Sequence, residues 1–202
     1  MKKIYIKYII GIVLLIAIVL GCLLMMNWRT SPGLSQDRIK QAYLYCCQHN
    51  MNKNVAIFVD YSIHSGKNRF IVYDFQKKKV ILSSLCTHGN GGGSTENKPV
   101  FSNQYGSNCS SLGMFKVGRY ITTTRAKLPA FLLDGLSATN SNARKRQILI
   151  HPYYTVCDIP TYPFHAPMNV SQGCFVISPL KFQALKTFFQ QGKPVLLWAY
   201  VK

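Results

Sequence analysis

The sequence predicts a mainly β domain, a sandwich or a barrel-like sheet with a few helices, preceded by one N-terminal transmembrane helix. Eight short apolar runs, rich in β-branched and aromatic residues, are separated by clusters of Gly, Asn and Pro. Such spacing is typical of short strands in an all-β domain. Only two stretches carry the caps and periodicity of helices, so a parallel α/β architecture is not expected.

The N-terminal segment contains an uncharged run at residues 8–28. A run of this length spans a hydrocarbon layer of about 30 Å as one helix. Three lysines precede the run and only Arg29 follows it closely. By the positive-inside rule, this asymmetry places the N-terminus in the cytoplasm and the rest of the chain outside.

This segment also predicts the domain boundaries. We expect residues 1–28 to form a cytoplasmic tip and a signal anchor in the cytoplasmic membrane, and residues 29–34 to form a linker. Residues 35–202 are then one extracytoplasmic, or periplasmic, domain. A cleaved signal peptide is the alternative, but its apolar core is usually about 7–15 residues long. We interpret Cys22 as an ordinary membrane-helix cysteine rather than a lipidation site.

The charge balance points to anionic partners. The chain has 24 Lys and Arg against 6 Asp and Glu, a formal charge of +18 that falls to +14 without the four cations flanking the apolar run. The basic run at residues 144–146 would suit nucleic acid, but a membrane anchor argues against that partner. Anionic cell-wall polymer or lipid headgroups fit the expected location better.

Two helices are expected in the outer domain. Ser35 can cap the first, with an acidic residue in the first turn and an amphipathic stretch at residues 38–49. The second is expected at residues 179–191, with Ser178 as cap, a proline in first position and Gly192 after its end.

The strands are expected where the apolar runs lie, with a hairpin joining the second and third. They are residues 55–62, 69–75, 80–86, 114–121, 131–136, 147–152, 174–178 and 195–201.

Six of the seven cysteines lie outside the apolar N-terminal run. In an oxidising compartment some of them can pair, but the connectivity does not follow from sequence. The six are Cys46, Cys47, Cys86, Cys109, Cys157 and Cys174.

His151 and Cys174 are the candidate base and nucleophile. His151 ends one apolar strand and Cys174 begins another, 23 positions later. If the two strands are neighbours, thiol and imidazole come within hydrogen-bond reach. A free thiol has a pKa near 8.5 and only the thiolate attacks efficiently, so Cys174 needs such a base. No acidic residue is placed to orient His151, and a backbone carbonyl is the expected partner.

The turn before Cys174 has the composition of an oxyanion site. Gly173 adds backbone freedom, so the amides of Gly173 and Cys174 can both point at a developing oxyanion. Ser171 can hold the turn or contact substrate. An equally consistent interpretation is that Cys174 packs in a core, Gly173 makes a turn and His151 is an interior histidine.

Three ordered blocks resemble a known family. They are FSNQYGSNCSSLGMF at 101–115, LDGLSATNSNARKRQILIH at 133–151 and SQGC at 171–174. Over about residues 60–200 the chain resembles the YkuD-like L,D-transpeptidase catalytic domains, in particular the murein L,D-transpeptidase branch. The resemblance implies a β-rich YkuD-like fold, with Cys174 as nucleophile, His151 as base and the Gly173 and Cys174 amides at the oxyanion.

The resemblance also implies a substrate and a reaction. In that family the thiolate attacks the bond before the terminal D-alanine of a peptidoglycan stem tetrapeptide, and an amine of a second stem resolves the thioester. No metal, nucleotide or other cofactor is called for. The family has a His-Gly near residues 88–89, so His88 is expected to line the cleft, and Gln172 with Ser171 is expected to contact substrate.

Departures from the family pattern leave alternatives open. Residues 152–153 are Pro-Tyr where the family usually has glycine, Gln172 stands where many relatives have Arg or His, and a proline-rich loop, a candidate lid, fills residues 158–169. An L,D-carboxypeptidase that hydrolyses the same bond is therefore an alternative, and so is a non-catalytic, membrane-anchored wall-binding module. The acceptor and the oligomeric state are left open.

Other patterns are weaker. The glycine-rich stretch at residues 87–95 lacks the lysine of a P-loop, so we expect a flexible connection. A zinc site built from Cys157, His165, Cys174 and His151 would match no compact ligand spacing. Arg146 precedes His151 by five residues, and this odd separation places them on opposite faces of a regular strand. If the strand starts later, Arg146 can reach a substrate carboxylate; a structural ion pair or solvent exposure is an equally consistent interpretation.

Overall fold

The computed structural model describes residues 11–20, 34–124, 127–189 and 192–202. It divides into two units, Met1–Gly33 and Leu34–Lys202, each considered by itself. In the first unit residues 11–20 are helical. Among the residues that the structure describes, no helix combines the length and the apolar character of a membrane span. The expected span at residues 8–28 extends beyond the described helix on both sides, so the membrane anchor stays a prediction.

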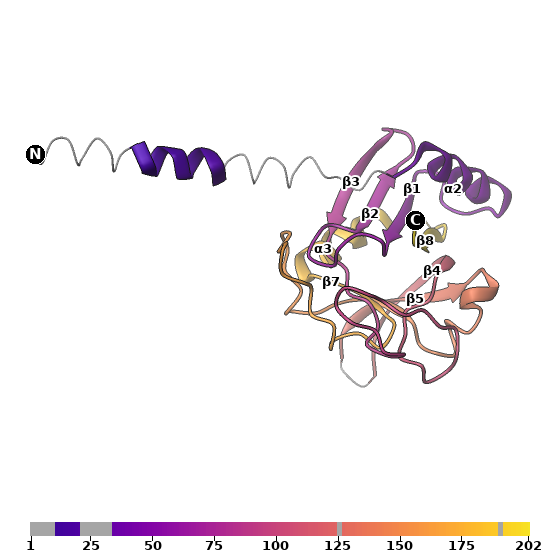
Figure 1. Ribbon diagram of the computed structural model, residues 1–202. Coiled ribbons are helices and arrows are strands. Elements are labelled where there is room, and N and C mark those ends of the chain that lie inside the picture. The colour runs from indigo at the N-terminus through magenta and orange to yellow at the C-terminus, as the bar shows by residue number, and fades with distance from the viewer. Residues whose placement is uncertain (1–10, 21–33, 125–126, 190–191) are drawn as a thin grey trace, which may run out of the picture. The chain divides into compact units, whose positions relative to one another are not determined.

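The second unit is built on one eight-stranded, barrel-like sheet, as expected from the spacing of the apolar runs (Figure 1). The strand order is β3-β2-β1-β8-β4-β5-β6-β7. The strands are β1 Val55–Asp60, β2 Phe70–Asp74, β3 Lys79–Ser84, β4 Gly113–Thr122, β5 Pro129–Gly135, β6 Leu149–Pro152, β7 Phe175–Ile177 and β8 Val195–Tyr200.

The sheet is mixed, and two of its pairs are parallel. β1 runs parallel to β8, and β6 runs parallel to β7, while the other neighbours are antiparallel. Parallel neighbours need a long connection, because the chain must return to the same end of the sheet. For β6 and β7 that connection is the proline-rich loop anticipated from the sequence.

The centre of the sheet is covered on both faces, so β1 is buried at all six positions. Alternate residues of a strand point to opposite faces. Val55, Ile57 and Val59 enter the main core, while Ala56 and Phe58 enter a second cluster. In a strand that is covered on both faces, the sequence is a continuous apolar run rather than an alternation of apolar and polar residues.

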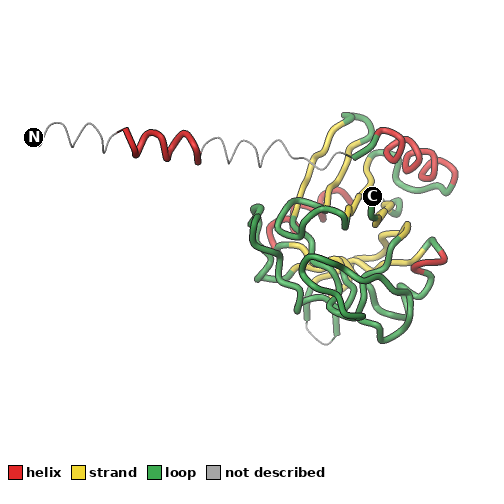
Figure 2. Tube along the Cα trace, in the orientation of Figure 1, coloured by secondary structure: helices red, strands yellow, loops and turns green. Residues whose placement is uncertain are grey.

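Two helices cover these faces. The first, α2 (Gln36–Gln48), buries Ala42 and Cys46 in the second cluster, and Ser35 caps it by accepting a bond from Arg38. The second, α3 (Pro179–Lys186), has Ser178 as cap and ends in the 3-10 turn η2 (Thr187–Phe189). It buries Phe182 and Leu185 in the main core and contacts both β3 and β6, which closes the curled sheet. A second 3-10 turn, η1, spans Ala138–Asn140. Figure 2 shows that loops make up much of the domain.

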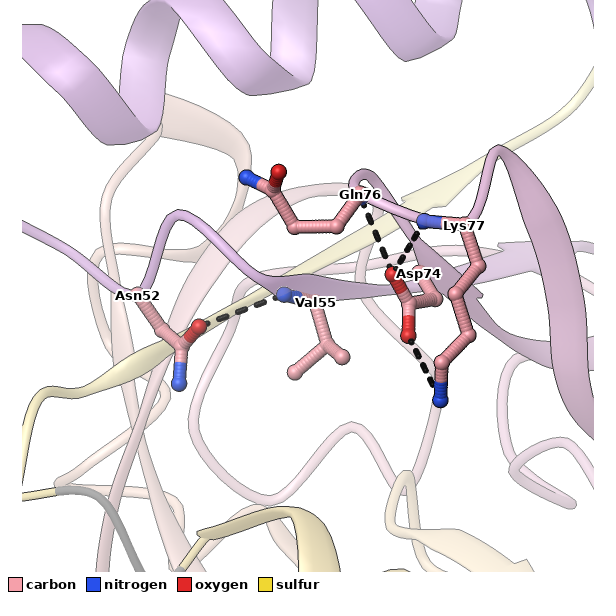
Figure 3. Close-up of polar contacts among 5 residues, drawn as sticks. All are labelled: Asn52, Val55, Asp74, Gln76 and Lys77. Atoms are coloured by element: carbon pink, nitrogen blue, oxygen red, sulfur yellow. Dashed lines mark hydrogen bonds and ion pairs between the residues drawn. The ribbon is translucent and has the colours of Figure 1, made fainter.

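Short polar side chains set the ends of the early strands (Figure 3). Asn52 Oδ1 accepts a hydrogen bond from the Val55 N–H at 3.2 Å, just where β1 begins. At the end of β2, Asp74 Oδ1 accepts hydrogen bonds from the N–H groups of Gln76 and Lys77 at 2.9 and 2.8 Å. These bonds occupy backbone donors that the strand ladders do not use, so the hairpin turns within a few residues.

Candidate active site

The pairing of β6 with β7 brings His151 and Cys174 to the same face of the sheet. Ile150 pairs with Phe175 and His151 pairs with Val176, so Cys174 lies level with Leu149. Cys174 immediately precedes β7. In a regular sheet, two residues along a strand and one strand across separate Cα atoms by about 8 Å. Side chains on one face at that diagonal separation can approach each other.

The packing of the neighbours confirms which face this is. Phe175 and Ile177 are fully buried in the main core, so these residues of β7 point inward. Val176 instead joins a small cluster with Leu85 and Val156, and Cys174 packs against it from the edge. The sulfur therefore lies on the outer side of the sheet, under loops rather than in the central core.

His151 is held as a neutral imidazole with one nitrogen occupied. Its Nδ1 lies 3.1 Å from the Pro152 carbonyl oxygen. Since a carbonyl only accepts, Nδ1 carries the proton and Nε2 carries the lone pair. Burial lowers the pKa of His151, and the bond to Pro152 opposes that effect in part. The partner that orients the ring is a backbone carbonyl, as expected from the scarcity of acidic residues.

Cys174 is a half-buried, unpaired thiol. All six cysteines of the second unit are free. The Cys174 Sγ lies 3.6 Å from the Gln147 carbonyl oxygen. Burial raises the pKa of Cys174 to about 11, against lowering effects from the Leu149 backbone and from Arg146. The thiol is therefore protonated at neutral pH, and a base is needed for it to attack.

The turn before Cys174 is shaped by Ser171 and Gly173. Ser171 is buried; its hydroxyl donates to the Cys174 carbonyl at 2.8 Å and accepts from the Gly173 N–H at 3.2 Å. Gly173 has φ +109°, and an ideal Cβ there would lie 2.5 Å from the Cys109 carbonyl oxygen. Ser171 thus holds the turn, and Gln172 is exposed beside it. The Gly173 N–H must exchange its Ser171 partner to serve an oxyanion, so that role stays a prediction.

The glycine-rich loop at residues 87–95 packs against this turn. Its Asn90 N–H donates to the Ser171 carbonyl at 3.1 Å. An ideal Cβ on Gly91 would lie 1.8 Å from the Ser107 carbonyl oxygen, so only glycine permits this approach of two backbones. We expected a flexible connection, whereas the structure shows a loop built into the wall around Cys174.

His88 belongs to the interior of that loop. Its side chain is buried, its Nε2 lies 2.9 Å from the Thr95 carbonyl oxygen and its Nδ1 lies 2.9 Å from the Arg69 guanidinium. Because Arg69 only donates, Nδ1 accepts and Nε2 carries the proton. Burial and Arg69 lower the pKa of His88 to about 4. Both ring nitrogens are occupied; contact of His88 with substrate stays a prediction.

Arg146 holds the loop beside Cys174, a role that sequence reasoning did not identify. Its Nη1 donates to the Ser102 carbonyl at 2.7 Å and to the Ser111 hydroxyl at 2.5 Å. Its Nη2 donates to the Cys109 carbonyl at 2.5 Å. Among the described residues, Arg146 forms no ion pair and is half-buried rather than exposed, so neither of these two expected alternatives holds. Gln147 has φ +56° and breaks the strand periodicity, and β6 begins only at Leu149.

The loop between His151 and Cys174 is tied to the segment after β1. The N–H groups of Thr161 and Tyr162 both donate to the Gly66 carbonyl, at 2.9 and 3.0 Å. His165 stacks on His64 with ring centroids 3.8 Å apart. Within the described residues, no group of three or more His, Cys, Asp or Glu side chains is arranged to hold a metal ion.

Comparison with protein-family models identifies one family. Residues 30–200 match the model of the L,D-transpeptidase catalytic domain family. No curated protein sequence matches the chain.

Several solved structures are similar in fold. The helical cell shape determining protein Pgp2 from Campylobacter jejuni is 15% identical, with 73% of this chain and 48% of that chain covered and a TM-score of 0.47. An L,D-transpeptidase from Xylanimonas cellulosilytica is 10% identical, with coverage of 78% and 68% and a TM-score of 0.41. An L,D-transpeptidase from Mycobacterium smegmatis is 13% identical, with coverage of 73% and 58% and a TM-score of 0.41.

This chain spans about half the length of the Campylobacter protein. The assignment to a family rests on the family-model match. That match covers residues 30–200, which include the strands and the loops around Cys174. The chain belongs to the L,D-transpeptidase catalytic domain family.

Proposed function

We propose that this protein is a cysteine-dependent acyltransferase that acts on peptidoglycan stem peptides as an L,D-transpeptidase. The observation that carries the proposal is the parallel pairing of β6 with β7, which puts a free thiol and a neutral imidazole on one face. The family match supports a cell-wall substrate.

The first half of the proposed reaction forms a thioester. His151 Nε2 takes the proton of the Cys174 thiol as the sulfur attacks the carbonyl before the terminal D-alanine of a stem tetrapeptide. Backbone amides of the turn stabilise the oxyanion. When the intermediate collapses, the C–N bond breaks and the imidazolium returns its proton to the departing amine of D-alanine.

The second half resolves the thioester. An amine of a second stem peptide attacks the thioester carbonyl, His151 removes a proton from this amine, and the C–S bond breaks to regenerate Cys174. Water as acceptor would give L,D-carboxypeptidase activity at the same centre. No step needs an oxidant, a metal or a cofactor.

The pKa values explain why the base matters. The pKa of Cys174 is raised to about 11, so little thiolate exists at pH 7 without assistance. The pKa of His151 is lowered, so the imidazole is neutral and able to accept a proton at that pH. Proton transfer is then expected to accompany attack on the carbonyl rather than to precede it.

Acylation by a carbapenem tests the nucleophile. The wild type is expected to gain the mass of one carbapenem, Cys174→Ala to gain none, and His151→Gln to react at least about a hundredfold more slowly. Cys157→Ala is the matched control, because Cys157 is an exposed thiol in the same loop. Adduct formation in Cys174→Ala at the wild-type rate would contradict the proposal.

Defined stem tetrapeptides test the reaction itself. Release of D-alanine together with a cross-linked dimer, identified by mass, supports transpeptidation. Release without a dimer indicates hydrolysis, and wall binding without either product indicates a binding module.

We also propose that residues 1–28 anchor the protein in the cytoplasmic membrane with residues 35–202 outside. The uncharged run and its flanking lysines support this orientation. Protease added to intact spheroplasts is expected to digest the domain while leaving a cytoplasmic marker intact. Protection of the domain until lysis would contradict the proposed orientation.

A further inference from the structure

A cavity of about 700 Å³ lies on the β4 and β5 side of the domain and includes neither Cys174 nor His151. Five cationic side chains line it against one carboxylate. They are Lys116, Arg119, Arg144, Lys186 and Lys193, with Asp134 as the acid. The groups that line the cavity therefore carry a formal charge of +4.

The sheet is irregular where it forms this cavity. Val117 pairs with Leu133 and Tyr120 pairs with Phe131, so Gly118 and Arg119 together face one residue of β5. Such a β-bulge turns a side chain away from the direction that a regular strand would give it. Arg119 is exposed there, and its side chain forms no hydrogen bond or ion pair with the described residues.

Gly118 lies in the bulge next to Arg144 and Asp134. An ideal Cβ there would lie 3.7 Å from Arg144 Nη2 and 3.9 Å from Asp134 Oδ2. A longer side chain would extend over these two groups. With glycine in place, a ligand in the cavity can approach the guanidinium of Arg144.

The single carboxylate is already shared by two of the cations. Asp134 lies 2.7 Å from Arg144 Nε and 3.4 Å from Lys116 Nζ. Arg144, followed by Lys116, holds the pKa of Asp134 below its usual range, so the carboxyl stays charged.

Besides Arg119, the remaining cations Lys186 and Lys193 have only neutral partners in the described part of the domain. Lys186 lies over the Tyr120 ring at 4.5 Å, and Lys193 bonds to Asn50 Oδ1 at 2.9 Å. Gathering these like charges is unfavourable, and an anion would relieve their repulsion.

We propose that this cavity binds phosphate groups of a linear phosphodiester polymer, separately from the peptide chemistry at Cys174. Guanidinium and ammonium groups together can donate hydrogen bonds to the oxygens of a tetrahedral phosphate group. The volume falls within the range of pockets that hold a small molecule and exceeds the needs of a single phosphate, so a repeating unit with its sugar or polyol fits. Tyr120, Phe131 and Phe189 supply an apolar floor for that part. The inference does not depend on catalysis by Cys174.

Binding of two probes to the full chain in detergent tests this proposal. The probes are inorganic tripolyphosphate and a synthetic glycerol-phosphate tetramer, measured by calorimetry at 50 and 300 mM NaCl. The triple variant Arg119→Gln, Lys186→Gln, Lys193→Gln is expected to bind the tetramer at least about tenfold more weakly than wild type. Higher salt is expected to weaken wild-type binding, because both partners are charged.

The matched control removes three charges elsewhere, by Lys53→Gln, Lys78→Gln and Lys79→Gln, at exposed positions outside the cavity. Its affinity is expected to stay within about twofold of wild type. An equal loss in both triple variants would overturn the proposal, because net charge alone would then explain binding. Thermal melting of both triple variants tests whether they fold. If the cavity triple variant misfolds, the single variant Arg119→Gln replaces it, and its affinity for the tetramer is expected to be at least threefold lower than that of wild type.

Two further arms separate the ligand sources. Tetraglutamate of similar charge is expected to bind at least tenfold more weakly than the phosphate tetramer, and equal binding would overturn the phosphate assignment. Vesicles of phosphatidylglycerol, compared with phosphatidylcholine, test a lipid headgroup. The polymer would be overturned as the ligand by one result: wild type binds these vesicles but not the tetramer, and the cavity triple variant does not bind the vesicles.

Discussion

Replacement of Arg146 by Met tests how the wall around Cys174 is held. Arg146 donates to the carbonyl oxygens of Ser102 and Cys109 and to the hydroxyl of Ser111, and it also lies 3.3 Å from the Ser107 hydroxyl. Hydrogen bonds from a charged donor contribute about 1.5–3 kcal/mol each. Because the Arg146 side chain is half-buried, water can replace some of these hydrogen bonds in the variant. We therefore expect a loss of about 3 kcal/mol in the free energy of unfolding.

The same replacement should slow the thiol. Arg146 lowers the pKa of Cys174 through its charge, and one pKa unit corresponds to about 1.4 kcal/mol. Movement of the Cys109 carbonyl would also disturb Gly173. We therefore expect Arg146→Met to reduce the rate of carbapenem acylation at least about tenfold.

Urea unfolding and intact-mass kinetics measure these two effects. Lys145→Met is the matched control, because Lys145 is the exposed neighbour in the same basic run and should change neither quantity by more than about 0.5 kcal/mol. Compared with Arg146→Met, Arg146→Lys should recover more of the acylation rate than of the unfolding free energy. Lysine keeps the positive charge but lacks the two donor nitrogens of the guanidinium end. An unfolding free energy within about 0.5 kcal/mol of wild type for Arg146→Met would refute the reasoning.

Three further predictions concern single residues. Gly173→Ala should be destabilised by about 2–4 kcal/mol in urea unfolding, because alanine is strained at φ +109° and its Cβ would meet the Cys109 carbonyl; a smaller loss than 1 kcal/mol would contradict that geometry. The pKa of His88 is lowered to about 4. Its contribution to the free energy of unfolding is therefore complete above pH 6.5, and up to about 3 kcal/mol of that free energy is lost as the pH falls toward 4. Unfolding of wild type between pH 7 and 4.5 should therefore be steeper in pH than that of His88→Asn, and parallel curves would count against the assignment. Alkylation of Cys174 by iodoacetamide should accelerate about tenfold per pH unit between pH 7 and 9, since its pKa is about 11, and a plateau below pH 9 would exclude that value.

The strands and helices followed from local sequence. Each of the eight apolar runs became a strand within a few residues of its expected bounds, because flanking Gly, Asn and Pro residues end pairing. Both helix caps, Ser35 and Ser178, act as expected by accepting a backbone N–H three residues on. Cys174 was expected to begin the seventh strand, whereas β7 begins one residue later, at Phe175.

Features that depend on distant segments did not follow from local sequence. The glycine-rich loop was expected to be flexible, but Gly91 lets it pack on Ser107. The position of Arg146 depends on a left-handed backbone conformation at Gln147, which no periodicity argument anticipates. Both cases involve contacts across many residues of chain, and only the folded loops show which backbones approach each other.

The sequence by itself determined the residue types of the chemistry: a thiol, an imidazole, a turn glycine and a basic surface, each placed at a strand end or loop. Only the tertiary structure decided the parallel register of β6 and β7, which puts Cys174 and His151 on one face, and the gathering of basic side chains around one bulge. The physical reason is that propensity and periodicity act within a few residues, whereas pairing partners and burial depend on how the whole sheet closes over its core.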